Sequence, residues 1–166
     1  MITARRLAAF ASLLSSLASV SLAAPMDLDV GLRASIYDEN YRLGLGGEIG
    51  AVVTTTPLWD MGLHLNYTRF NPKNEDSWDP VNEYGGYLAF YYKPAIDQGF
   101  SLRIGPHLGY AMIHDNYFDL GGDVMAVFKV SPGMSFYGAF IPSFMFGEDG
   151  QSLIRIGLGL EFGTAR

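Results

Sequence analysis

Three histidines are the residues of this sequence whose chemistry first suggests a site. His64 lies two residues before Asn66 in an alternating stretch, His107 lies in a similar stretch, and His114 follows in a polar segment. Histidine serves as a general base and as a metal ligand, but a single buried histidine is more often part of a packed polar network. No group of residues has the ligand spacing typical of a metal site. We therefore expect no bound metal and no cofactor.

The segment 154–162 indicates how such residues are positioned. Isoleucine, leucine and phenylalanine alternate in it with Arg155, glycine and Glu161, and a period of two is typical of a strand with one apolar face. With its polar Arg155 and its aromatic Phe162, the segment resembles the C-terminal signal by which the bacterial assembly machinery recognises outer-membrane β-barrels. We therefore expect the barrel assembly machinery to bind the stretch that begins with Arg155 and ends with Phe162.

Seven further segments repeat the alternation: 26–37, 41–53, 58–70, 83–93, 99–113, 119–130 and 134–146. No helical pattern separates them. Strands of about ten to thirteen residues have the length that a tilted strand needs to cross a bilayer. An even number of strands in a meander closes into a barrel without an exposed edge. The sequence thus predicts an all-β fold: an eight-stranded antiparallel up-and-down transmembrane β-barrel.

The same alternation is compatible with a soluble barrel such as a lipocalin, whose apolar face points inward. Two features favour the membrane barrel. Arg69, at a strand end, is the only charged residue predicted on the apolar face, as expected where a charge at the bilayer midplane costs about 2–4 kcal/mol. In addition, aromatic residues on the apolar face fall at the two predicted rims, where outer-membrane barrels carry aromatic girdles. One rim holds Trp59, Tyr92, Phe100, Phe128, Phe136 and Phe162, and the other holds Tyr37, Tyr41, Tyr84, Tyr110, Phe144 and Phe146.

The polar faces of the strands predict the barrel interior. They are rich in glycine, which suits the narrow lumen of an eight-stranded barrel. Their charges are expected to balance, because buried charges must be paired. The basic set is Arg33, Arg42, Lys93, Arg103, Lys129 and Arg155, and the acidic set is Asp29, Glu48, Asp60, Glu83, Asp123 and Glu161.

Residues 1–23 have the pattern of a cleavable signal peptide, with Arg5 and Arg6 before an apolar segment and small residues before the predicted cut after Ala23. Residues 24–166 are then expected to form one barrel domain, a monomer in the outer membrane of a Gram-negative-type bacterium. This part holds nine basic and seventeen acidic residues, a balance that argues against nucleic-acid binding. Short periplasmic turns and longer outer loops are usual, which places 38–40, 71–82, 114–118 and 147–151 outside.

Several short motifs together resemble the lipid A palmitoyltransferase (PagP) family of eight-stranded outer-membrane enzymes. The resemblance covers about the last two-thirds of the expected mature chain. The motifs run in order: Asp76-Ser77-Trp78; Tyr84-Gly85; Lys93-Pro94; Phe100-x-Leu102 with Gly105 and Gly109; Asp115-Asn116-Tyr117; Ile141-Pro142; and the terminal aromatic strand.

The resemblance implies acyl transfer from phospholipid to lipid A at the outer leaflet, with Asp76 and Ser77 as catalytic residues. A hydroxyl nucleophile needs a base and a carboxylate that orients the base. The family's first-strand histidine is missing here, since the corresponding position is near Leu32 or Arg33. His114 or His64 could replace it, and His114, which is better placed, is the stand-in base. The family's helix before the barrel is missing as well.

The resemblance also implies an apolar upper lumen for the acyl chain, lined by Tyr87, Ala89, Ala111, Met125, Ala139 and Ile141. Pro142 would mark a lateral access point for lipid, because a proline removes a ladder hydrogen bond. Pro106 is a second interruption, without a counterpart in the family.

The sequence leaves two functions open. One is a PagP-like enzyme that acylates lipid A. The other is a non-catalytic small barrel of the OmpA or OmpX type that serves surface integrity or contact. A porin is excluded because an eight-stranded barrel is too narrow for one.

Overall fold

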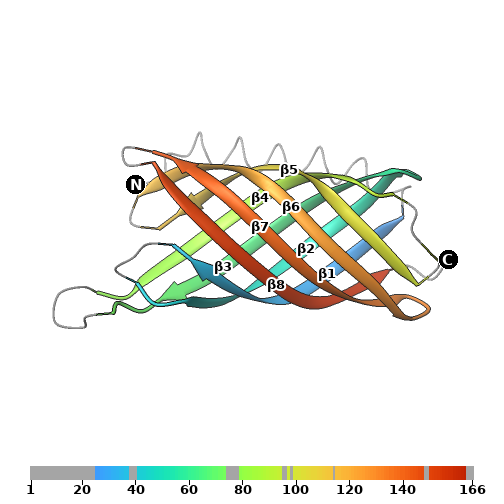
Figure 1. Ribbon diagram of the computed structural model, residues 1–166, viewed down its shortest axis with the longest axis horizontal. Coiled ribbons are helices and arrows are strands. Elements are labelled where there is room, and N and C mark those ends of the chain that lie inside the picture. Colours follow the sequence, from blue (N-terminus) through green and yellow to red (C-terminus); the bar gives the residue numbers. More distant parts are fainter. Residues whose placement is uncertain are drawn as a thin grey trace, which may run out of the picture.

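The computed structural model describes residues 25–37, 41–73, 79–94, 97, 99–113, 115–147 and 150–163. They form eight strands: β1 (Met26–Ile36), β2 (Gly44–Thr56), β3 (Trp59–Phe70), β4 (Val81–Tyr92), β5 (Phe100–Met112), β6 (Asn116–Ser131), β7 (Met134–Phe146) and β8 (Gln151–Gly163). Each strand pairs antiparallel with the next, and β1 pairs with β8 to close the barrel. The strands cross the barrel obliquely (Figure 1). Within the described ranges, no helix is long and apolar enough to span a bilayer.

The two ends of the barrel differ in their connections. At one end, which we call the short-turn rim, two-residue turns join β2 to β3 and β6 to β7, and Gly133 in the second turn has a φ of 80°. A left-handed backbone of this kind favours glycine. The opposite end, which we call the long-loop rim, carries the connections 37–43, 71–80, 113–115 and 147–150.

Several strands begin at other residues than the alternation predicts, and β2 and β6 show the reason. β2 begins at Gly44 rather than at position 41, because Tyr41 is buried and makes an isolated bridge to Pro72. β6 begins earlier than predicted, at Asn116, because its first residues pair with β5, from Met112↔Asn116 onward.

The apolar faces of the strands point outward, as predicted. Leu32 in the middle of β1 is 77% exposed. At the short-turn rim, Trp59 contacts Tyr92 and Phe100 contacts Phe128. At the long-loop rim, most of the predicted aromatics are exposed, namely Tyr84, Tyr110, Phe144 and Phe146. The prediction was wrong for Tyr41, which is buried, and Tyr37 packs against it.

The prediction of balanced interior charges was wrong. Arg42 and Lys129 are exposed, because both lie close to a strand end, where alternation no longer determines direction. Asp119, which the prediction left out, is buried. The buried set is therefore acidic: Asp29, Glu48, Asp60, Glu83, Asp119, Asp123 and Glu161 against Arg33, Arg103 and Arg155.

Two prolines coincide with gaps in the strand pairing. The β6–β7 register passes from Gly121↔Ser143 directly to Val124↔Phe140, so that Pro142 has no partner on β6. The β4–β5 register shows the same gap opposite Pro106, between Ala89↔His107 and Tyr92↔Ile104. Proline has no N–H to donate, which accounts for the missing rungs.

Candidate functional site

An apolar layer lies inside the barrel on the side of the long-loop rim. It consists of Tyr41, Phe70, Val81, Ala111, Tyr117, Met145 and Leu153, all buried, with Tyr37 and Ile113 packed against them. Alternation predicts several of these as inward residues of their strands. The layer separates the polar interior from the long-loop rim.

Arg155 of β8 is the centre of the next group. Its Nη2 lies 3.0 Å from Glu83 Oε1 and 2.7 Å from Asp119 Oδ2, and its Nη1 donates to the Ser143 hydroxyl at 3.0 Å. Asn66 donates to the same Glu83 oxygen at 2.8 Å. A buried guanidinium with two carboxylates satisfies the requirement that buried charges be paired and hydrogen-bonded.

A chain of polar contacts crosses the lumen at mid-height. His107 of β5 contacts Asp119 and Asp123 through its two ring nitrogens. Asp123 Oδ2 accepts a hydrogen bond of 3.0 Å from the Tyr91 hydroxyl, which lies 3.1 Å from His64 Nε2. The single hydroxyl proton of Tyr91 is directed to the carboxylate, so the Nε2–H of His64 must donate to the tyrosine oxygen.

His64 of β3 also faces two carboxylates through its other nitrogen. Its Nδ1 lies 3.6 Å from Asp29 Oδ1 and 3.6 Å from Glu48 Oε1. Arg33 and Tyr87 bind the second oxygen of Glu48, with the tyrosine hydroxyl at 3.0 Å. The Tyr87 ring stacks on the imidazole, with ring centroids 4.8 Å apart and an interplanar angle of 13°.

A second ionic group lies near the short-turn rim. Arg103 of β5 contacts Glu161 and donates to Asp60 Oδ2 at 2.8 Å, and Lys93 donates to the other Asp60 oxygen at 2.8 Å. Lys93, Arg103 and Glu161 line part of a cavity of about 320 Å³, which is also bounded by the β6–β7 turn. Polar, ion-paired walls of this kind suit water or small ions rather than an acyl chain.

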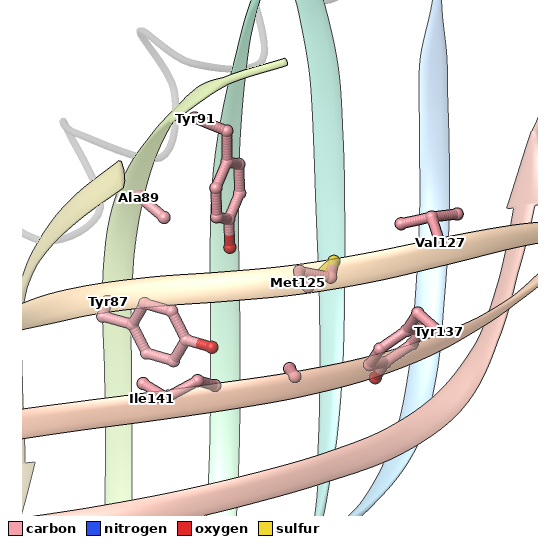
Figure 2. Packing of buried hydrophobic residues seen from close by; sticks show 8 residues of the cluster. Tyr87, Ala89, Tyr91, Met125, Val127, Tyr137 and Ile141 are labelled. Atoms are coloured by element: carbon pink, nitrogen blue, oxygen red, sulfur yellow. The ribbon is translucent and has the colours of Figure 1, made fainter. Parts of the chain in front are cut away.

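An apolar cluster occupies the lumen between these groups. It consists of Tyr87, Ala89, Tyr91, Met125, Val127, Tyr137, Ala139 and Ile141. Figure 2 shows these side chains, from β4, β6 and β7, projecting into the enclosed space. Most of the residues expected to line an acyl pocket are here, and they pack against one another beside Arg33 and His64.

The predicted catalytic residues Asp76, Ser77 and His114 lie outside the described residues. Pro142 lies in β7, at the β6–β7 gap. His64 and His107 point inward as predicted, and their described partners are carboxylates and tyrosines, which is typical of a polar network rather than of an activated nucleophile.

The grouping of Asp29, Glu48 and His64 is what reasoning from the sequence missed. The three carboxylate and imidazole donors come from three neighbouring strands and lie within 4.8 Å of one another. Alternation predicts each as an inward residue, but only the strand registers Asp29↔Gly50 and Gly50↔His64 bring them together.

Comparison with solved structures finds other small outer-membrane barrels. The attachment invasion locus protein Ail of Yersinia pestis matches at 14% identity and a TM-score of 0.60 over 85% of this chain and 99% of that one. Neisserial surface protein A matches at 12% identity and 0.61 over 86% and 96%. OprG from Pseudomonas aeruginosa matches at 9% and 0.63 over 87% and 97%. No protein-family model and no curated protein matches the sequence.

At these identities the likeness shows the fold alone, and it does not choose between the two functions. The outward apolar face, the aromatic rims and the closed register agree with that fold. The chain is a small eight-stranded antiparallel β-barrel of the bacterial outer membrane.

Proposed function

We propose that this protein is a non-catalytic outer-membrane barrel that supports surface integrity or contact. The observation that carries the proposal is the filling of the lumen. Below the apolar layer, the interior holds the Arg155 group, the histidine chain and the His64 carboxylates, all buried. A palmitoyl-sized chain needs a continuous apolar pocket, and charges without partners in such a pocket are costly.

Acyl transfer is the second candidate, and Pro142 is the observation that favours it. The missing rungs opposite Pro142 weaken the wall between β6 and β7. Such an interruption is a place where a lipid chain could enter from the bilayer, as the resemblance to the PagP family implies. In this alternative, Asp76 and Ser77 act in the 71–80 connection and His114 serves as the base.

Mass spectrometry of lipid A separates the two functions. Cells that express the protein are compared with cells that lack it, and we expect the same acyl pattern in both. An additional acyl chain that disappears in Ser77→Ala would overturn the non-catalytic proposal. An additional chain that persists in Ser77→Ala would also overturn it and would place the nucleophile elsewhere. A dye-uptake assay on the same cells is expected to show greater permeability without the protein.

The charge of the outer connections restricts the kind of contact. If the long-loop rim faces outward, as is usual, the connections 37–43, 71–80, 113–115 and 147–150 present eight acidic and two basic residues, a net charge of −6. Ail has been solved in complex with the heparin analogue sucrose octasulfate. For this chain, an anionic rim favours cationic partners over such polyanions.

A further inference from the structure

We propose that Asp29, Glu48 and His64 form a binding site for one divalent transition-metal ion in the lumen, with Zn²⁺ as its representative. The site joins β1, β2 and β3 from the inside. It does not depend on whether the barrel is an enzyme, because the predicted acyltransferase residues Asp76, Ser77 and His114 are not among the three.

The donor atoms are buried and lack ordinary partners. Asp29 is 0% exposed, and neither of its carboxylate oxygens has a hydrogen-bond partner. His64 Nδ1 has none either. An unsatisfied buried carboxylate is costly, so a proton or a cation is required between these groups.

The separations fit ligands of one ion better than hydrogen-bond partners. Nδ1 lies 3.6 Å from an oxygen of Asp29 and 3.6 Å from an oxygen of Glu48, which is too long for a hydrogen bond. Two donors bound to one tetrahedral zinc ion at about 2.0–2.2 Å lie roughly 3.3–3.6 Å apart. The two separations from Nδ1 match that value, and all three donor atoms lie within 4.8 Å of one another.

The surrounding contacts orient the donor atoms of His64 and Glu48 toward the common centre. The His64 Nε2–H donates to Tyr91, which in turn donates to Asp123, so Nδ1 keeps its lone pair for a metal. Metal-bound histidines usually donate their second nitrogen in this way. Arg33 and Tyr87 bind one oxygen of Glu48 and leave the other directed at His64.

Gly50 provides open space beside the donors. A Cβ at this position would lie 2.4 Å and 2.7 Å from the two Asp29 oxygens and 2.5 Å from His64 Nδ1. Any side chain here would press on the donors, and glycine leaves them free to approach an ion.

The charge of the lumen also favours a cation. Seven buried carboxylates and the half-buried Asp27 face three buried arginines and the half-buried Lys93. With His64 and His107 neutral, the excess is four negative charges among the described residues. A divalent ion offsets two of them, and the imidazole nitrogen among the donors favours Zn²⁺ over Mg²⁺ or Ca²⁺.

The test measures zinc retained by the full barrel refolded in detergent. Because the donors are buried, Zn²⁺ is supplied during refolding, with excess Mg²⁺ present, and weakly bound metal is then removed with a chelating resin. We expect one zinc per wild-type chain and a higher unfolding temperature than for barrel refolded with a chelator. X-ray absorption of the loaded protein should show only nitrogen and oxygen ligands, with imidazole scattering.

Two variants and a control locate the ion. Asp29→Asn removes one ligand charge at a residue that accepts no hydrogen bond, and Gly50→Ala crowds the donors while keeping all three. We expect at least tenfold weaker zinc retention in both. Asp119→Asn is the matched control, because it also removes a buried carboxylate from a histidine, His107, and should retain zinc as the wild type does.

Absence of zinc from the folded wild type would overturn the proposal and leave His64 as a protonated partner of its two carboxylates. Equal retention in wild type and Asp29→Asn would overturn it as well. If Asp29→Asn does not fold, Gly50→Ala and the absorption spectrum of the wild type still decide. These readouts do not depend on lipid A, so the site and the proposed function fail separately.

Discussion

At the scale of single residues, Arg155 is the largest fully buried side chain among the described residues. It is fully buried between Glu83 and Asp119. Arg155→Met would leave two buried carboxylates without their cation, and breaking a buried pair in this way costs about 3–5 kcal/mol. Urea unfolding of the barrel in lipid vesicles measures the loss. The control is Lys129→Met, at an exposed lysine, which should change stability by less than about 0.5 kcal/mol. Equal unfolding midpoints for the two variants would refute the assignment.

Leu32 tests the lipid-facing surface. It lies in the middle of β1 and is highly exposed. An arginine there would sit in hydrocarbon, at a cost of about 2–4 kcal/mol, whereas the cost near the interface is about 0–1 kcal/mol. Leu43→Arg, at an exposed leucine just before β2, is the matched control. We expect Leu32→Arg to unfold at clearly lower urea than Leu43→Arg. The reverse order would place the membrane at a different height.

The direction of a single side chain was predictable in the middle of strands and less so at their ends. Alternation correctly places His64, Asp29 and Glu48 inward, because a period of two leaves no choice once one face is apolar. Arg42 and Lys129 were placed wrongly because neighbouring loops and turns release the backbone from the pleat. The meeting of Asp29, Glu48 and His64 depends on strand register, which the sequence pattern does not specify.

At the scale of elements, the eight strands were predictable because each carries its own apolar stripe. The residues at which the strands begin and end were less predictable, because contacts between distant parts of the chain determine them. The bridge between Tyr41 and Pro72 delays β2, and a register shift between Thr54 and Thr56 adjusts the turn into β3. Neither the bridge nor the register shift leaves a pattern in the local sequence.

Pro142 allows a test of the wall between β6 and β7. Pro142→Ala supplies an N–H opposite Gly122, where a rung is missing. We expect slower hydrogen exchange of the amides on both sides of the gap, measured by mass spectrometry of peptides from β6 and β7. Pro106→Ala is the control, since it should slow exchange at the β4–β5 gap instead. Unchanged exchange in Pro142→Ala would mean that the β6–β7 gap has another cause. If acyl transfer occurs and uses this opening, Pro142→Ala should also reduce it.

At the scale of the whole molecule, the outer face of the barrel determines its location, whereas its function depends on the lumen and the connections. The aromatic rims and an outer face whose charge lies only near a strand end follow from the lipid that surrounds the barrel, so most strands carry their signature in sequence. The inward side chains do not contact lipid, so no repeated pattern marks them. The chemistry of the lumen depends on which side chains meet across the barrel. The predicted catalytic residues Asp76 and Ser77 belong to the connection between β3 and β4. Neither contact with lipid nor strand alternation constrains the sequence there.

The distribution of charge over the molecule predicts its preference among soluble partners. The connections at the long-loop rim carry a net charge of −6, while the two-residue turns at the short-turn rim carry none. The long-loop rim therefore repels a polyanion and attracts a polycation, and both effects weaken as salt is added. We expect the refolded barrel to bind a cationic peptide such as oligolysine at low salt and to show no binding of a sulfated polysaccharide. Replacement of Glu148 and Asp149 by lysine changes the rim from −6 to −2 and should weaken oligolysine binding severalfold. Tight binding of the polyanion by the wild-type chain at physiological salt would show instead that its contacts are specific and override the net charge.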